Sequence, residues 1–302
     1  MDGSPLTVAD ILGPDGSIAK RLDHYEDRPQ QLEMAEAVAD AIAGKRHLIV
    51  EAGTGVGKSF AYLTPAILAA TDPKAKPSAG AGAAEAGHAP AAAGGSAANA
   101  AKPVEPCRVV ISTHTIALQE QLLGKDLPLL NSVIPREFSA VLVKGRRNYV
   151  SLRRLQAAQK RSMSLFDRDE EFAELRRLAK WAGETHDGSL ADLDPRPMPT
   201  VWDEAASDSG NCLGRRCPTH SKCFYYAARR RMQHAQVLVV NHALLFSDIA
   251  LRRHGVSLLP DYDVVVIDEA HTIEQVAGEH LGLKITSGQI EYLLNKLYND
   301  RT

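Results

Sequence analysis

The sequence lacks the features of membrane, secreted and strongly charged proteins. No apolar run approaches the roughly 20 residues of a transmembrane helix, and the first residues lack the basic and apolar regions of a secretory signal. Four cysteines in 302 residues are too few for a disulfide scaffold. The 35 basic and 37 acidic residues nearly cancel, so net charge does not predict a nucleic-acid partner. We therefore expect a cytoplasmic, globular protein with no membrane partner, in which a nucleic-acid site would depend on local basic clusters.

Large apolar side chains are nearly absent from residues 72–106, which consist mainly of Ala, Gly, Pro and Ser. Such a segment has little to bury, which favours a disordered, low-complexity insertion. An Ala-rich helix is the alternative, but the repeated Gly and Pro residues would interrupt it. The segment separates two patterned parts of the chain.

Five short runs of mostly β-branched apolar residues predict buried strands of a parallel sheet. They are residues 47–50, 108–112, 140–143, 237–240 and 264–267. Helical patterns lie between several of them; residues 29–43, for example, carry apolar residues at helical spacing, with Pro29 suited to a first turn and Gly44 to a C-terminal cap. This alternation predicts an α/β domain with helices on both faces of the sheet.

A glycine-rich string follows the first of these runs and precedes an apolar helical stretch at residues 60–69. It fits the phosphate-binding P-loop, with Ala in place of the first Gly. Glycines allow backbone N–H groups to surround phosphate oxygens at the N-terminus of a helix, where Lys58 would reach the phosphates and Ser59 would bind Mg²⁺. The predicted ATP-binding residues are Ala52, Gly53, Thr54, Gly55, Val56, Gly57, Lys58 and Ser59.

Two adjacent carboxylates follow the last apolar run, in the string Asp268-Glu269-Ala270-His271. Together with a P-loop upstream, carboxylates at the end of a buried strand predict a site that hydrolyses ATP. Asp268 would hold Mg²⁺, and Glu269 would orient or deprotonate the attacking water. The candidate catalytic residues are Lys58, Asp268, Glu269 and His271.

The P-loop and the Asp-Glu-Ala-His string together resemble those of superfamily 2 helicases, and two further strings resemble the XPD/DinG family. Residues 28–31, Arg-Pro-Gln-Gln, resemble its adenine-reading element, which implies that Arg28 and Gln31 face the base. Residues 112–121 resemble motif Ia, which contacts the DNA backbone. The resemblance implies DNA contacts by Thr113, Thr115 and Gln119. By themselves, Gln31 could be solvated and the Ser/Thr-rich start of motif Ia could be a helix cap.

Residues 144–149 and 239–245 resemble the segments that open and close the family's iron–sulfur insertion. Between them, Cys212, Cys217 and Cys223 lie within twelve positions, a density of thiolate ligands that favours zinc or an iron–sulfur cluster. The family holds its cluster with four cysteines, and Ser151 stands at the position of the first. We expect an iron–sulfur cluster whose fourth ligand is Ser151, water or His220. Zinc held by the three cysteines and His220, or plain thiols, are the alternatives.

Two basic clusters flank the cysteines. Residues 141–166 contain seven Lys or Arg residues and no acidic residue, and residues 229–231 are all Arg. Such clusters bind phosphates, and an aromatic ring offers a stacking face to an unpaired base. A solvated helix face is the alternative for residues 229–231. The predicted contacts to single-stranded DNA are Lys144, Arg146, Arg147, Tyr149, Arg229, Arg230 and Arg231.

These observations predict an organisation around one RecA-like domain. The segments are an N-terminal extension (1–24), the two parts of the RecA-like domain (25–139 and 235–278), a mostly helical, cysteine-containing insertion (140–234) and the start of an Arch-like insertion (279–302). The resemblance, which covers nearly the whole chain, implies an ATP-dependent DNA helicase that moves 5′ to 3′ on single-stranded DNA in repair or replication. It implies no particular protein partner.

Helicases of this class need two RecA-like domains, and only one fits in the chain. We therefore expect the N-terminal part of a longer helicase, inactive or feebly active by itself. The alternatives are an RNA helicase of the same superfamily, which the cysteine insertion argues against, and a non-catalytic fragment that binds nucleotide or nucleic acid.

Overall fold

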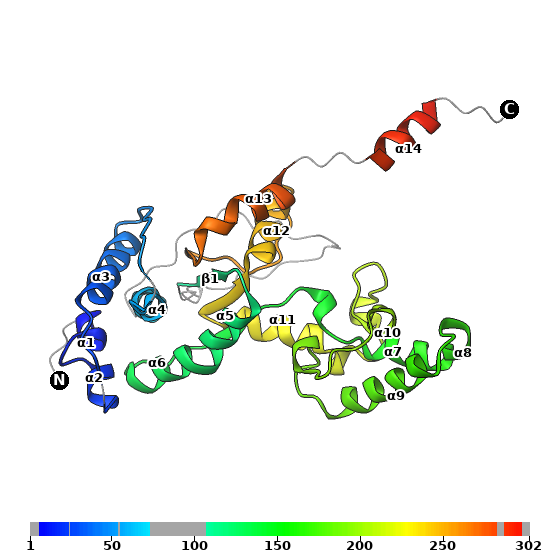
Figure 1. Cartoon of the computed structure of the whole chain (residues 1–302), viewed down its shortest axis with the longest axis horizontal. Helices are drawn as coiled ribbons and strands as arrows, with labels where there is room; N and C mark the ends of the chain where they lie inside the picture. The colour runs from blue at the N-terminus through cyan, green and yellow to red at the C-terminus, as the bar shows by residue number, and fades with distance from the viewer. Residues whose placement is uncertain (1–5, 24, 54, 73–106, 283–286, 298–302) are drawn as a thin grey trace, which may run out of the picture.

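The predicted α/β architecture is present in a computed structural model of the chain, which describes residues 6–23, 25–53, 55–72, 107–282 and 287–297 (Figure 1). The predicted disordered insertion at residues 72–106 lies outside the described residues, except for Asp72. No described helix is both long and apolar enough to cross a membrane.

A parallel sheet of four strands lies at the centre of the RecA-like part. Its strands are β1 (Val109–Thr113), β2 (Ala140–Leu142), β3 (Val237–Asn241) and β4 (Val264–Ile267), in the order β2-β3-β1-β4. Val109 pairs with Val237 on one side and Val264 on the other. Since β1 and β3 are central, their apolar residues are fully buried, as expected of a sheet that is covered on both faces. Four of the five predicted strands are thus confirmed.

The predicted strand at residues 47–50 is wrong. These residues belong to no strand, and Ile49 is 96% exposed. A strand needs a hydrogen-bonded neighbour, and no strand in the described part of the chain pairs with this segment. The only described neighbour of β4 is β1, so the sheet has a free edge at β4.

Successive residues of a strand point to opposite faces of the sheet, so the apolar strands present apolar side chains on both faces. Helices cover each face. Val109 and Ile111 belong to a core shared with Ile11, Leu63 and Ile67 of the N-terminal helices. Val110 belongs to a second core, with Met232 of α11 (Phe224–His234) and Leu245 of α12 (His242–Arg252). The N-terminal helices are α1 (Ala9–Leu12), α2 (Ser17–Arg21), α3 (Pro29–Ala43) and α4 (Lys58–Ala70).

The helix predicted at residues 29–43 is confirmed as α3, with Pro29 in its first turn and Gly44 as its C-cap. Between β1 and β2 the chain forms α5 (Ile116–Gln121), a π-helical turn (Leu122–Asp126) and α6 (Leu127–Val133). After β4 it forms α13 (Ile273–Leu281), which is followed by α14 (Ser287–Leu297).

A mostly helical module between β2 and β3 has a hydrophobic core of its own. Figure 1 shows it on the side of the sheet away from α1 and α2. Its helices are α7 (Leu152–Lys160), α8 (Ser162–Leu165), α9 (Asp169–Glu184) and α10 (Pro199–Ala205). Leu155, Leu178 and Val201 are buried among them. The module therefore does not depend on the sheet for its apolar core.

Candidate functional site

The P-loop lies at the start of α4, whose first residue is Lys58. Gly57 has φ 83°, in the left-handed region that glycine favours, and a Cβ atom there would lie 2.0 Å from the Gln31 side chain. The left-handed backbone conformation therefore favours glycine here, and a side chain would also displace the Gln31 amide. Thr54, one of the predicted ATP-binding residues, lies outside the described residues.

The P-loop meets the acidic string at the end of β4, as the sequence predicts. Lys58 Nζ lies 3.6 Å from Glu269 Oε1, and His271 Nδ1 lies 3.4 Å from Glu269 Oε2. Asp268 precedes them, and its Oδ1 accepts the N–H of Glu269 at 3.0 Å. The four candidate catalytic residues thus form one cluster, while their catalytic roles remain predictions.

Tyr62 is a buried member of this cluster that the sequence analysis missed. Its hydroxyl donates to Asp268 Oδ2 at 3.1 Å. Burial, followed by the nearby Asp268 carboxylate, raises the pKa of the phenol, so it remains a hydrogen-bond donor at neutral pH. The available signal was a phenol hydroxyl in the mostly apolar α4 sequence, one turn after Lys58.

Asp126 is a second missed residue, at the end of the π-helical turn. Burial raises the pKa of its carboxyl, while hydrogen bonding from Ser59 and Gln121 lowers it. π-helical turns occur frequently at functional sites. Asp126 thus brings a carboxyl from the π-helical turn after α5 to the hydroxyl that is predicted to bind Mg²⁺.

The two residues predicted to read adenine hold the P-loop backbone. Arg28 Nη1 donates to the carbonyl of Gly55 at 2.9 Å, and Gln31 Nε2 donates to the carbonyl of Gly57 at 2.9 Å. Gln31 is only 6% exposed, so it is not a solvated residue. Contact with a base remains a prediction for both.

The three residues predicted to contact DNA in motif Ia have different environments. Thr113 and Gln119 are buried, so neither side chain is available to a backbone phosphate in this conformation. Thr115 is exposed and caps α5, with its hydroxyl accepting the N–H of Leu118 at 3.2 Å. The cap interpretation is therefore confirmed for Thr115, which is also the member of the three that can reach a ligand.

Several residues of the predicted basic surface form internal contacts. Lys144 Nζ donates to Ser189 Oγ at 2.6 Å, Arg231 pairs with Asp187, and Arg229 donates to the carbonyl of Leu258. These three cations are therefore already engaged within the protein, and their contacts with DNA remain predictions.

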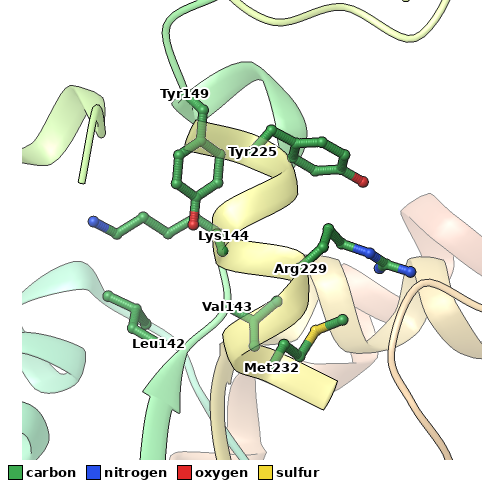
Figure 2. A pocket seen from close by; sticks show the side chains of 8 residues that line it. Leu142, Val143, Lys144, Tyr149, Tyr225, Arg229 and Met232 are labelled. Atoms are coloured by element: carbon green, nitrogen blue, oxygen red, sulfur yellow. The ribbon is translucent and has the colours of Figure 1, made fainter. Parts of the chain in front are cut away.

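The aromatic part of this surface is also turned inward. Figure 2 shows Tyr149 and Tyr225, with Lys144 and Arg229, around a small cavity above the end of β2. The cavity has a volume of about 10 Å³, too small for a base. The stacking role predicted for Tyr149 is not available in this conformation, because its ring is 2% exposed.

Three further arginines complete the predicted DNA contacts. The Arg146 guanidinium lies 3.8 Å from the centroid of the Tyr225 ring. Arg147 has a side chain that is 74% exposed and pairs with Asp203 at 2.7 Å. Arg230 is exposed and forms no ion pair with a described residue. Arg147 and Arg230 are thus exposed at the surface, as is Arg231 despite its ion pair.

The surroundings of Cys212 lower the pKa of its thiol. Burial acts to raise the pKa of Cys212, but hydrogen bonds from the Gly214 N–H and from Arg146 outweigh it, so the pKa lies below its usual value. Cys217 Sγ lies 3.3 Å from Thr219 Oγ1. Cys223 is the N-cap residue of α11.

The predicted ligands of the cysteine site are not arranged to hold a metal ion in this conformation. In the described ranges, no three His, Cys, Asp or Glu side chains lie close enough to hold one ion. Ser151, at the family's first ligand position, is the N-cap of α7, and its hydroxyl accepts the N–H of Arg154 at 3.4 Å. The iron–sulfur cluster and the zinc alternative therefore remain predictions.

A parallel sheet, a P-loop that opens α4 and a carboxylate pair after β4 define a RecA-like, P-loop nucleotide-binding domain. The family model described as DEAD_2 matches residues 210–290. The chain is 31% identical over 286 residues to "ATP-dependent DNA helicase YoaA" of Escherichia coli, covering 94% of this chain and 39% of that protein. It is 34% identical over 283 residues to "ATP-dependent helicase DinG" of Mycobacterium tuberculosis, covering 87% and 37%.

The "ATP-dependent DNA helicase YoaA" of Haemophilus influenzae is 30% identical over 285 residues, covering 94% of this chain and 39% of the relative. The chain belongs to the DinG family of superfamily 2 helicases. It spans about two fifths of the length of these curated relatives.

Proposed function

We propose that the chain is the ATP-binding part of an ATP-dependent DNA helicase, in which ATP hydrolysis drives movement along single-stranded DNA. The observation that carries the proposal is the contact between the P-loop lysine, Lys58, and Glu269 of the acidic string. The names of the relatives support helicase activity and, for several of them, DNA as the substrate. Work in DNA repair or replication belongs to the same proposal.

In hydrolysis, different residues would bind the phosphates and orient the attacking water. Backbone N–H groups from Gly55 to Ser59 would bind the phosphates, and Lys58 would exchange Glu269 for the β- and γ-phosphates. This exchange would release the Glu269 carboxylate to orient the attacking water. Mg²⁺, when bound, neutralises charge on the phosphate oxygens.

The residues that would hold Mg²⁺ come from two elements. Asp268 follows β4 and Ser59 lies in the first turn of α4. The Tyr62 hydroxyl occupies one oxygen of the Asp268 carboxylate and restricts its rotation. Oxygen ligands of this kind suit Mg²⁺.

Complete helicase activity needs a second RecA-like domain, because ATP lies between two such domains and an arginine of the second stabilises the transferred phosphoryl group. Translocation and unwinding are therefore proposed for a longer protein that contains this chain. For this chain alone we propose nucleotide binding, slow hydrolysis and binding of single-stranded DNA through Thr115, Arg147 and Arg230.

A metal site in the cysteine loops is the least supported part of the proposal. It is favoured by the lowered pKa of Cys212 and by two neighbouring 3₁₀ turns, Gly214–Arg216 and His220–Lys222, which Cys217 and Cys223 directly follow. Gathering the three thiols would require these turns to move. Iron and sulfide analysis after anaerobic purification, with zinc measured in parallel, distinguishes an iron–sulfur cluster from zinc and from plain thiols.

The proposed function is tested by nucleotide binding combined with competition between single strands. Purified chain should bind a fluorescent ATP analogue in the presence of Mg²⁺, and an unlabelled DNA oligonucleotide should displace labelled DNA better than RNA of the same sequence. Better displacement by RNA would favour the RNA helicase alternative. Binding of ATP without any phosphate release would favour the non-catalytic fragment.

A further inference from the structure

The buried histidine at the start of α12, His242, connects two parts of the site. It is 2% exposed, and its Nδ1 lies 2.6 Å from the hydroxyl oxygen of Ser112 near the end of β1. Ser112 is also buried. β1 and β3 are paired, with Thr113 opposite Asn241, so this contact lies at the carboxyl edge of the sheet, where the acidic string also begins.

Ser112 also contacts Asp268, the predicted Mg²⁺ ligand. Its backbone carbonyl accepts the N–H of Asp268 at 2.9 Å. The same residue begins the motif Ia string, whose Thr113 and Thr115 follow directly. A short bonded path thus runs from His242 through Ser112 to Asp268, and it branches at Ser112 into the loop that carries Thr115.

One ring nitrogen of His242, Nε2, is buried and has no hydrogen-bond partner of normal geometry among the described residues. The Asp268 backbone lies close enough to affect the pKa of the ring but does not complete such a bond. Leaving a buried polar atom unpaired costs about 1–3 kcal/mol, and an apolar side chain at this position would avoid that cost. Buried unpaired polar groups are rare in folded proteins, so this one calls for a role that packing alone does not supply.

The environment lowers the pKa of the His242 ring below its usual value. Burial lowers its pKa first, and His114, whose ring centroid is 6.0 Å away, lowers it further. The backbone and carboxylate of Asp268 act in the opposite direction. His242 therefore lies close both to Asp268 and to His114 of the motif Ia string.

We propose that His242 is a positioning residue that couples the motif Ia loop to Asp268 through its hydrogen bond with Ser112. The inference rests on the proposed function, since it assumes that motif Ia meets DNA and that Asp268 binds Mg²⁺. His242 contacts neither ligand. It fixes Ser112, so that a displacement of the Thr113–Thr115 loop on DNA binding changes the position of the Asp268 backbone.

The test measures how much Mg²⁺ the complete 302-residue chain needs to bind a fluorescent ATP analogue, with and without a single-stranded oligonucleotide. For the unsubstituted chain, the oligonucleotide should lower the half-saturating Mg²⁺ concentration. For His242→Leu, this concentration should rise about fivefold, the fold-change equivalent to one net hydrogen bond, and the effect of the oligonucleotide should disappear.

Two further variants separate positioning from simple packing. In His242→Asn, the amide places a polar atom near the position of Nδ1, so the response to the oligonucleotide should return. Ser112→Ala removes the other partner and should behave like His242→Leu, and the double variant should be no worse than either single variant. If His242→Leu fails to fold, Ser112→Ala still tests whether the hydrogen bond between Ser112 and His242 is needed for the coupling. His254→Leu, an exposed histidine just beyond α12, is the matched control.

The coupling is overturned if Ser112→Ala and His242→Leu keep the normal Mg²⁺ requirement and the normal response. It is also overturned if His242→Asn is as defective as His242→Leu, or if the unsubstituted chain does not respond to the oligonucleotide. Lys58→Ala separates this result from the proposed function. If Lys58→Ala binds the nucleotide normally, the P-loop assignment itself is wrong, whatever the His242 variants do.

Discussion

Lys58 and Glu269 neutralise each other across the candidate ATP site, with Nζ and Oε1 3.6 Å apart and both side chains about one third exposed. At this exposure the pair contributes little to folding stability, because solvent screens it. The ion pair instead keeps Lys58 and Glu269 next to each other, close to the positions where they would contact the phosphates and the attacking water. A phosphate that attracts the lysine would at the same time release the carboxylate that serves the water.

Tyr62→Phe should raise the Mg²⁺ concentration needed for nucleotide binding about fivefold, because it removes one hydrogen bond to Asp268. The raised pKa of the phenol keeps it protonated at neutral and moderately alkaline pH, so the effect should not vary between pH 7 and 9. Tyr25→Phe, which removes a hydrogen bond to the Leu12 carbonyl, is the control. An equal Mg²⁺ effect in both variants would show general destabilisation.

Gln31→Ala should weaken the binding of ATP and GTP by the same factor, because Gln31 holds the Gly57 carbonyl of the P-loop. Measured affinities for the two nucleotides provide the comparison. A selective loss of ATP binding would instead support the adenine-reading role that the sequence predicts. Gln30→Ala, at the adjacent exposed position of α3, is the matched control.

Arg147→Glu and Arg230→Glu should weaken binding of single-stranded DNA, and each lost phosphate contact should reduce the log–log salt slope by about 0.7. Arg229→Glu and Arg231→Glu should instead lower the thermal unfolding temperature, since these residues hold Leu258 and Asp187. Salt titrations of binding and unfolding scans separate the two groups. Unchanged salt slopes for Arg147→Glu and Arg230→Glu would show that these two arginines are solvated and do not contact DNA phosphates.

Cys107 should resist alkylation at pH 7–8 in the folded protein, because burial, with Asp263 nearby, raises its pKa to about 11. A raised pKa means that the thiolate is scarce below pH 11, and the thiolate is the reactive form. Alkylation of Cys107 should therefore accelerate as the pH rises towards 11. Mass spectrometry of peptides from native and unfolded protein measures this rate, and fast native labelling at pH 7 would contradict the prediction.

The buried strands could be predicted because β1 and β3 are covered on both faces, which leaves a continuous apolar run in the sequence. Residues 47–50 have the same local pattern and form no strand. A run of apolar residues records a tendency to be buried, but pairing depends on a neighbouring strand elsewhere in the chain. Periodicity contains no information on that neighbour.

The meeting of Lys58 with Glu269 could also be predicted, because both follow from motifs of known spacing. Tyr62 and Asp126 could not, since their contacts depend on how α4 and the π-helical turn pack against β4 and the P-loop. The internal contacts of the basic residues could not be predicted for a related reason. Sequence shows that Lys144 and Arg231 are charged, but only the fold shows that Ser189 and Asp187 already bind them.

The most direct test of the account compares Lys58→Ala with Glu269→Gln in two assays, binding of a fluorescent ATP analogue and single-turnover release of phosphate. Lys58→Ala should lose productive nucleotide binding. Glu269→Gln should bind at least as tightly as the unsubstituted chain, because the lysine is freed from its partner, and should release no phosphate above background. Normal phosphate release by Glu269→Gln would contradict the assignment of Glu269 to the attacking water and with it the proposed ATP-hydrolysing site.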